Sequence, residues 1–323
     1  MILINLFDTL NISYSQVLKN WLNARKNQIK ESSYLKYLSI IETTINPELG
    51  NYKFKNLTNK NIVDFFNSKK MLETSDSTKK ITLIIIKSSI NYGISKKYRK
   101  SFGKIDIKLK KPKNKIIYFT KKEQEQLSNY LINNLNLRNL GILLSLYTGI
   151  RIGELCGLKW KDIDFRNKTL SINKTVQRIK NTEKNSLLKT KLIVDIPKTE
   201  HSIRTIPLPD FLIPILDSFK TNNENFIFTN SLTPKDPRAF EKYFSSVLEK
   251  CQIRNLNFHA LRHTFATRAR EAGIDIKVLS EILGHSSYHI TQEIYVHISV
   301  DFKRESIDSL VDYLSTKKFV EHV

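Results

Sequence analysis

A short span near the C-terminal end of the chain gathers side chains that bind anions and transfer protons. Residues 257–298 contain His259, Arg262, His285 and Tyr295. His259 and Arg262 are three positions apart, so on a helix they would share one face. Guanidinium groups donate paired hydrogen bonds to phosphate oxygens, imidazoles transfer protons, and a phenol can act as a nucleophile. The combination predicts a site for an anionic oxygen group.

Two helices are expected to position these side chains. Apolar residues recur at spacings of three and four from Phe258 to Phe265, which predicts an amphipathic helix. Gly273 stands where that helix should end. A second periodic run at 276–283 then leads to His285.

The charge balance predicts a polyanionic partner. The chain has 323 residues, with 53 Lys and Arg against 31 Asp and Glu, which gives a net charge of +22. This length is enough for about two domains. Frequent use of Lys, Asn and Ile suggests an AT-rich gene, which inflates lysine but would not by itself suppress acidic residues. Double-stranded DNA or RNA is therefore favoured over a membrane as partner.

Nothing in the sequence indicates a metal site, a disulfide or a membrane span. Cys156 and Cys251 are expected to be free thiols in a reducing cytoplasm, and zinc-ligand spacing is absent from the sequence. Residues 1–10 lack the basic start of a signal peptide, and the longest apolar stretch, at 140–150, is too short to cross a bilayer. The prediction is a soluble cytoplasmic protein without cofactors.

The N-terminal part is expected to be all helical. Apolar residues at helical spacing recur through 12–100, with lysines between the stripes, and Ser32 or Ser33 is expected to cap the second helix. The predicted boundaries are a helical DNA-binding domain at 1–102, a basic linker at 103–117 and a second domain at 118–323.

The second domain is expected to be α+β. Thr120 and Glu123 form a capping-box signature, and an apolar helix is expected to end at Gly149. Three short runs favour β-structure, namely 170–173, 193–196 and 204–208. The overall fold class is therefore mainly α with a small β-sheet.

The chain resembles the tyrosine recombinase, or phage-type integrase, family. Residues 144–164 are similar to its first box, in which an arginine follows a Thr-Gly turn, and 259–265 and 283–287 are similar to its second and third boxes. Residues 197–207 resemble its β-hairpin turn, which presents a lysine, and Tyr295 stands at its nucleophile position. The resemblance implies an N-terminal all-α SAM-like core-binding domain and a C-terminal tyrosine recombinase catalytic domain.

The resemblance implies that Tyr295 attacks a DNA phosphodiester, forming a 3′-phosphotyrosine and releasing a 5′-hydroxyl. A phenol has an ordinary pKa of about 10, so it needs help to lose its proton. Arg151 and Arg262 would hold the non-bridging oxygens, since each guanidinium is planar, permanently charged and able to donate twice. The covalent link conserves the bond energy, so rejoining needs no ATP. Neither a Gly-rich phosphate loop nor a carboxylate cluster suited to magnesium accompanies the boxes, which agrees with a reaction free of metal and nucleotide.

Three further residues receive roles from the same resemblance. His285 would add a third donor to the phosphate, Lys198 would protonate the leaving 5′ oxygen, and His259 would assist proton movement around Tyr295. Glu154 would either orient Arg151 or serve only as a charge at a helix start. His263 is expected to be structural. The remaining histidines of this region are not expected to be catalytic, namely His201, His289 and His297.

The sequence is compatible with several biological roles. The long insertion at 169–207 favours an integrase/excisionase-type transposase of a phage or conjugative transposon. The alternatives are a Xer-type chromosome or plasmid dimer resolvase, a DNA-binding regulator that has lost catalysis, and a type IB topoisomerase. Residues 302–323 show helical spacing of apolar residues. This tail would either dock on a neighbouring protomer of a homo-tetramer on DNA or pack on its own domain.

Overall fold

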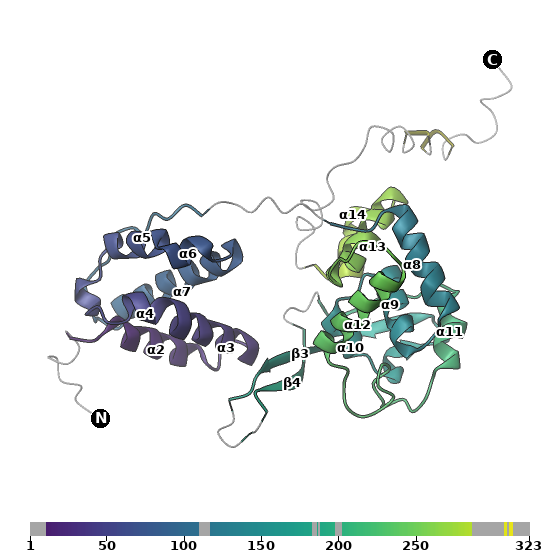
Figure 1. Cartoon of the computed structure of the whole chain (residues 1–323), viewed down its shortest axis with the longest axis horizontal. Coiled ribbons are helices and arrows are strands. Elements are labelled where there is room, and N and C mark those ends of the chain that lie inside the picture. Colours follow the sequence, from purple (N-terminus) through teal and green to yellow (C-terminus); the bar gives the residue numbers. More distant parts are fainter. Residues whose placement is uncertain are drawn as a thin grey trace, which may run out of the picture. The chain divides into compact units, whose positions relative to one another are not determined.

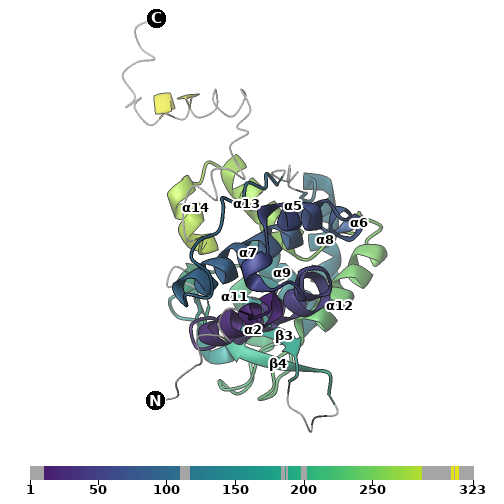
Figure 2. The same ribbon diagram turned by 90° about the vertical axis from the view of Figure 1, so that its left-hand side faces the viewer.

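The structure, a computed structural model, describes residues 11–109, 117–182, 186, 188–197, 202–285, 307–308 and 310–312. The chain divides into two units, Met1–Asn114 and Lys115–Val323, which are drawn in Figures 1 and 2. In the part that the structure describes, helices are too short or too polar to cross a membrane.

From residue 12 to residue 100 the named elements of the first unit are all helical, as predicted. Its helices are α2 (Tyr14–Arg25), α3 (Glu31–Ile40), a π-helical turn (Ile41–Ile45), α4 (Asn46–Leu49), a 3-10 turn (Phe54–Asn56), α5 (Asn59–Asn67), α6 (Lys69–Glu73) and α7 (Asp76–Ser95). Helices α2 and α7 pack side by side (Figures 1 and 2), and the buried hydroxyl groups of Tyr14 and Ser89 lie 2.9 Å apart.

The start of α3 corrects one prediction. The helix begins at Glu31 after Lys30, and no side chain caps it, so neither Ser32 nor Ser33 is the cap. An acidic side chain in the first turn interacts favourably with the positive end of the helix dipole. Glu31 therefore allows the helix to begin before the serines, which lie inside it.

The segment after α7 packs on its own unit. Residues 101–109, which include the start of the predicted linker, form neither helix nor strand. The apolar side chains of Ile105, Ile107 and Leu109 nevertheless lie partly buried against the core of the first unit. The alternation of apolar and polar residues in this segment explains why one side of an extended chain can pack in this way.

The second unit is mainly helical with small antiparallel sheets, which confirms the predicted fold class. Its helices are α8 (Lys121–Asn133), α9 (Leu137–Thr148), α10 (Ile152–Cys156), a 3-10 turn (Trp160–Asp162), α11 (Leu212–Ser218), α12 (Pro237–Lys250), α13 (His259–Glu271) and α14 (Ile276–Leu283). Its strands are β1 (Ile163–Asp164), β2 (Thr169–Ile172), β3 (Thr175–Lys180), β4 (Thr190–Asp195) and β5 (Arg204–Pro207).

Within the described residues of this unit, the strands form two separate antiparallel sheets. One has the order β1-β2-β5, with Leu170 opposite Ile206, and both of these side chains are buried. The other is the two-stranded ribbon β3-β4, which Figure 1 shows extending away from the helices of its unit. Arg178 on β3 fixes the ribbon, because its Nε lies 2.8 Å from Oδ2 of Asp236, the residue that caps α12.

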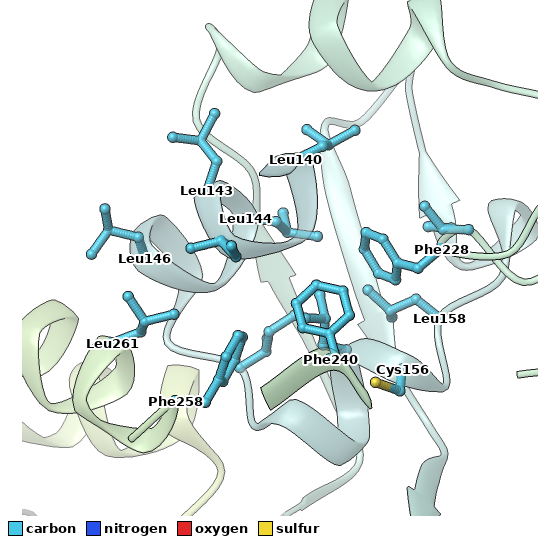
Figure 3. Close-up of a cluster of buried hydrophobic side chains, with 14 of the residues drawn as sticks. Leu140, Leu143, Leu144, Leu146, Cys156, Leu158, Phe228, Phe240, Phe258 and Leu261 are labelled. Atoms are coloured by element: carbon cyan, nitrogen blue, oxygen red, sulfur yellow. The ribbon is translucent and has the colours of Figure 1, made fainter. Parts of the chain in front are cut away.

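Helix α9 forms the centre of the second core. Figure 3 shows Leu140, Leu143 and Leu144 of this helix in one cluster of buried side chains with Phe240 and Phe258. The two rings meet edge to face, with centroids 5.6 Å apart. Helix α13 packs against α9. The core therefore brings the end of α9, where the first box lies, next to the helix that carries the second box.

Candidate active site

Arg151 is placed by a sharp turn at the end of α9. Gly149 has φ +66°, a left-handed conformation that ends the helix as predicted. Arg151 then stands at the start of α10, where its backbone N–H donates to Oε2 of Glu154 at 3.0 Å. Its Nη1 donates to Oε1 of the same carboxylate at 2.8 Å. Glu154 thus fixes both the backbone and the guanidinium of Arg151.

Arg262 lies on α13 and is 3% exposed. Its Nη1 donates to the carbonyl of Gly149 at 2.9 Å, and its Nη2 donates to the carbonyl of Leu283 at 2.7 Å. Arg151 reaches the same turn, with Nη2 donating to the carbonyl of Gly284 at 3.3 Å. The two guanidinium groups therefore meet at the C-terminal end of α14, where unpaired helix carbonyls attract cations.

Arg204 on β5 belongs to the same cluster, although the sequence alone predicted no role for it. Its Nη2 lies 2.8 Å from Oε2 of Glu154, its Nη1 lies 3.2 Å from Oε1, and its Nε donates to the carbonyl of Ile282 at 2.6 Å. The available signal was an arginine at the start of an expected strand, a few residues after Lys198. Its partner, Glu154, is 50 positions away, which local patterns do not reveal.

The Glu154 carboxylate is buried between two guanidinium groups and is 3% exposed. Burial alone would raise the pKa of this carboxyl, but the hydrogen bonds and charge of Arg204, followed by the charge of Arg151, outweigh it and lower the pKa to about 2. Glu154 is therefore ionised at neutral pH, and its contacts support the orienting role over that of a simple charge at the helix start.

Two of the predicted histidines face the same positive field. Burial, followed by the charges of Arg262 and Arg151, lowers the pKa of His285 to about 3. Burial, followed by the charges of His263 and Arg262, lowers the pKa of His259 to about 4. Both imidazoles are consequently neutral at pH 7, and each then has one N–H donor and one nitrogen acceptor.

His263 packs beside His259 on the first turns of α13. The two rings lie edge to face, with centroids 4.7 Å apart. Burial, followed by the charge of Arg262, lowers the pKa of His263. The contact supports the structural role expected for His263.

A cavity of about 350 Å³ opens beside the cluster. Its wall is partly apolar and partly polar, and it is formed by Ile150, Arg151, Ile152, Glu241, Asn257, Phe258 and His259. Glu241 is held in place because one of its carboxylate oxygens accepts from the backbone N–H of Phe258 at 2.8 Å. The cavity gives Arg151 and His259 a shared open space.

The structure brings four of the predicted site residues together, namely Arg151, His259, Arg262 and His285. Lys198 and Tyr295 lie outside the described residues, as do His201, His289 and His297. Among the residues that the structure describes, His, Cys, Asp and Glu do not group in a way that could hold a metal ion.

Comparison with known sequences identifies both units. Residues 117–301 match the model of the phage integrase family, and residues 13–71 match that of the phage integrase N-terminal SAM-like domain. A tyrosine recombinase XerC-like protein of Caldanaerobacter subterraneus subsp. tengcongensis is 29% identical over an alignment of 333 positions. The alignment covers 94% of this chain and 84% of that protein.

Solved structures show the same fold. The Tn1549 transposon integrase in complex with transposon right end DNA aligns with a TM-score of 0.76 at 22% identity, covering 93% of this chain and 100% of that one. A lambda integrase tetramer bound to a Holliday junction aligns with a TM-score of 0.65 at 17% identity, covering 88% of this chain and 78% of that one. Since the phage integrase model matches more than half of the chain, this protein belongs to the phage integrase family of tyrosine recombinases.

Proposed function

We propose that this tyrosine recombinase cleaves and rejoins specific DNA sites through a covalent link between Tyr295 and the 3′ phosphate. The observation that carries the proposal is the convergence of Arg151 and Arg262 on the end of α14, next to two neutral imidazoles. A phosphodiester carries one negative charge, and its transition state concentrates charge on the non-bridging oxygens. Two guanidinium groups held by the protein match that charge before the reaction begins.

In the proposed reaction, the phenolic oxygen of Tyr295 attacks phosphorus and the bond to the 5′ oxygen breaks. The leaving oxygen takes a proton from Lys198, and the phenol gives up its own proton towards His259. A neutral His259 suits this step, because only the neutral imidazole has a nitrogen that can accept a proton. Attack of a 5′-hydroxyl on the phosphotyrosine reverses the step and rejoins a strand.

The arginines and His285 are proposed to bind the non-bridging oxygens. Contacts with the carbonyls of Gly149 and Leu283 set the plane of Arg262, and contacts with Glu154 set that of Arg151. Donors that are already oriented need no rearrangement when charge develops, which is the source of their catalytic effect. A neutral His285 can add an N–H donor to the same oxygens.

We propose that the biological role is that of an integrase or transposase of a phage or conjugative transposon. The likeness to the Tn1549 transposon integrase over 93% of this chain supports it. The β3-β4 ribbon supports it as well, because the chain inserts this ribbon after β2 and before β5, two strands that pair with each other in the other sheet. A Xer-type dimer resolvase is the second candidate, which the similarity to the XerC-like relative favours.

The proposed partners are double-stranded recombination sites in the cytoplasm and further copies of this chain. Ile307, Leu310 and Val311 in the C-terminal tail are 60%, 50% and 54% exposed. Apolar side chains at helical spacing gain stability when they enter a groove of another protein. The similar lambda integrase forms a tetramer on a Holliday junction, which supports a homo-tetramer on DNA for this chain. The exposed tail is the segment that we propose to exchange between its protomers.

The test is covalent capture on a DNA duplex nicked beside the cleavage position, built from repeats that flank the gene. Wild-type protein should form a DNA adduct that survives denaturation, whereas Tyr295→Phe should form none. Tyr288→Phe is the matched control, because it removes a hydroxyl from the same segment and should retain capture. Absence of an adduct with wild-type protein on any cognate site would contradict the proposal. Relaxation of ordinary plasmid by monomers would favour a topoisomerase instead.

A further inference from the structure

Arg204 takes no part in the proposed chemistry, yet its side chain is only 6% exposed and makes some of the shortest polar contacts near the site. We infer that Arg204 is a positioning residue that allows Glu154 to orient Arg151 without cancelling its positive charge. This inference rests on the proposed function, because it concerns how Arg151 binds phosphate. It is carried by two sets of contacts, one with Glu154 and one with α14.

The first set of contacts concerns charge. A lone carboxylate that pairs with Arg151 would fix the guanidinium but would also offset its charge, which the phosphate needs. Both oxygens of Glu154 instead accept hydrogen bonds from Arg204, at 3.2 Å and 2.8 Å. Arg151 Nη1 lies 2.8 Å from Oε1 of the same carboxylate. The three residues together carry one net positive charge. The negative charge of Glu154 is therefore shared, and Arg151 remains cationic towards a bound phosphate.

The second set of contacts concerns the end of α14. Its last carbonyls accept from three arginines: Ile282 from Arg204 at 2.6 Å, Leu283 from Arg262 at 2.7 Å and Gly284 from Arg151 at 3.3 Å. The carbonyls at a helix C-terminus have no partners within the helix, and the helix dipole favours cations there. Arg204 thus anchors the same peptide segment on which both phosphate-binding arginines rest. His285 is the next residue along the chain.

The experiment is a double-mutant cycle on the single-turnover rate of covalent capture, with DNA affinity measured in parallel. Its variants are Arg204→Met, Glu154→Gln and the two combined. A small displacement of a catalytic group slows a reaction by up to about 10²-fold. We expect Arg204→Met to approach that loss while DNA affinity is unchanged. The combined variant should lose much less than the product of the two single losses, because both changes break one interaction. Losses that multiply would overturn the inference.

Two further variants separate positioning from general damage. Arg204→Lys keeps the charge but not the planar donor pair, so it should recover part of the capture rate lost in Arg204→Met. Arg178→Met is the matched control, because it removes another 2.8 Å arginine–carboxylate ion pair, between Arg178 on β3 and Asp236 at the start of α12, and this pair does not include Glu154. It should retain capture. An equal loss in Arg178→Met would show that any broken ion pair in this unit slows the enzyme, and it would overturn the inference.

A readout that does not use activity distinguishes failure of this inference from failure of the proposed function. A carboxyl whose pKa is lowered by folding stabilises the fold when the pH is above the pKa of the unfolded state. For Glu154, this contribution is lost as the pH falls towards the folded-state pKa of about 2. Arg204→Met should therefore destabilise the protein most near pH 7 and progressively less towards pH 3 in urea unfolding. If wild-type protein captures no DNA, the proposed function fails while this measurement still tests the coupling. A loss of stability that is the same at every pH would contradict the coupling.

Discussion

Arg262 Nη1 donates to the carbonyl oxygen of Gly149 at 2.9 Å, although the two residues lie 113 positions apart. Gly149 has a left-handed backbone, and a Cβ added there would lie 2.5 Å from Phe265 Cδ1 and 2.9 Å from Leu283 Cδ2. The turn of the first box is therefore held by residues of the second and third boxes. This relationship makes the turn a sensitive position for both stability and catalysis.

Gly149→Ala should destabilise the protein and slow covalent capture. The left-handed backbone costs about 1–2 kcal/mol for a residue with a Cβ, and crowding against Phe265 and Leu283 adds about 1–3 kcal/mol. Gly273→Ala is the matched control, since Gly273 has φ +82° but a Cβ there would meet nothing within 4 Å. Urea unfolding of both variants checks this. Equal losses would mean that the packing around Gly149 contributes nothing.

Arg151→Lys and Arg262→Lys should each reduce the rate of capture about 10²- to 10³-fold, the loss typical of one preplaced donor. Lysine keeps the charge but lacks the planar fork that contacts the carbonyls of α14 and a phosphate together. DNA affinity should change little, since the rest of the basic surface is intact. Arg254→Lys, in an exposed ion pair with Glu123, is the control and should retain full activity. A loss of affinity alone would contradict the proposed role.

The two buried imidazoles should make stability fall on acidification. In the unfolded chain, histidine has a pKa of about 6.5. In the folded protein, burial and nearby positive charges lower the pKa of His259 to about 4 and that of His285 to about 3, so both rings stay neutral until the pH falls that far. The resulting loss of folding stability is therefore absent above pH 7 and grows as the pH is lowered. His259→Asn and His285→Asn should each flatten the dependence between pH 6 and 5 by up to about 1.4 kcal/mol per pH unit, measured by urea unfolding. Unchanged slopes would count against the burial of these rings.

Deleting residues 305–323 tests the proposed exchange of the C-terminal tail. The truncated protein should bind a single DNA site but lose tetramer assembly and cleave more slowly, because the exposed Ile307, Leu310 and Val311 would be gone. Mass measurement of the protein–DNA complex and covalent capture check this together. A chain carrying Leu310→Ser and Val311→Ser, with the same length, should behave like the deletion. If both variants assemble and cleave as wild type does, the tail does not dock on a neighbour.

Local chemistry predicted much of the helical framework. Thr120 begins α8 with the predicted capping box, because the cap residue and its partner Glu123 lie only three positions apart. Gly149 and Gly273 follow the ends of α9 and α13 with positive φ, as their positions indicated. Such signals depend on a few neighbouring residues, so they can be read without knowing the fold.

Features that depend on distant partners were missed. Strand β3 was not predicted, since Gln177, Arg178 and Lys180 leave it without a clear apolar face, and its pairing with β4 decides its conformation. Arg204 escaped notice because Glu154 and α14 define its role only in the folded chain. The types of the site residues were visible in the sequence, whereas the contacts that orient them depend on packing across the whole unit.

The β3-β4 ribbon has a consequence for handling the protein in solution. In the part of the chain that the structure describes, the sheet that holds these strands has only two members, so each strand has an outer edge that pairs with no further strand. Val194 on β4 is 47% exposed. Such edges can recruit strands from other molecules and start aggregation, and charged side chains such as Lys180 and Lys189 at the ends of the ribbon oppose this. High salt, which weakens repulsion between lysines, should therefore promote aggregation through this ribbon when DNA is absent.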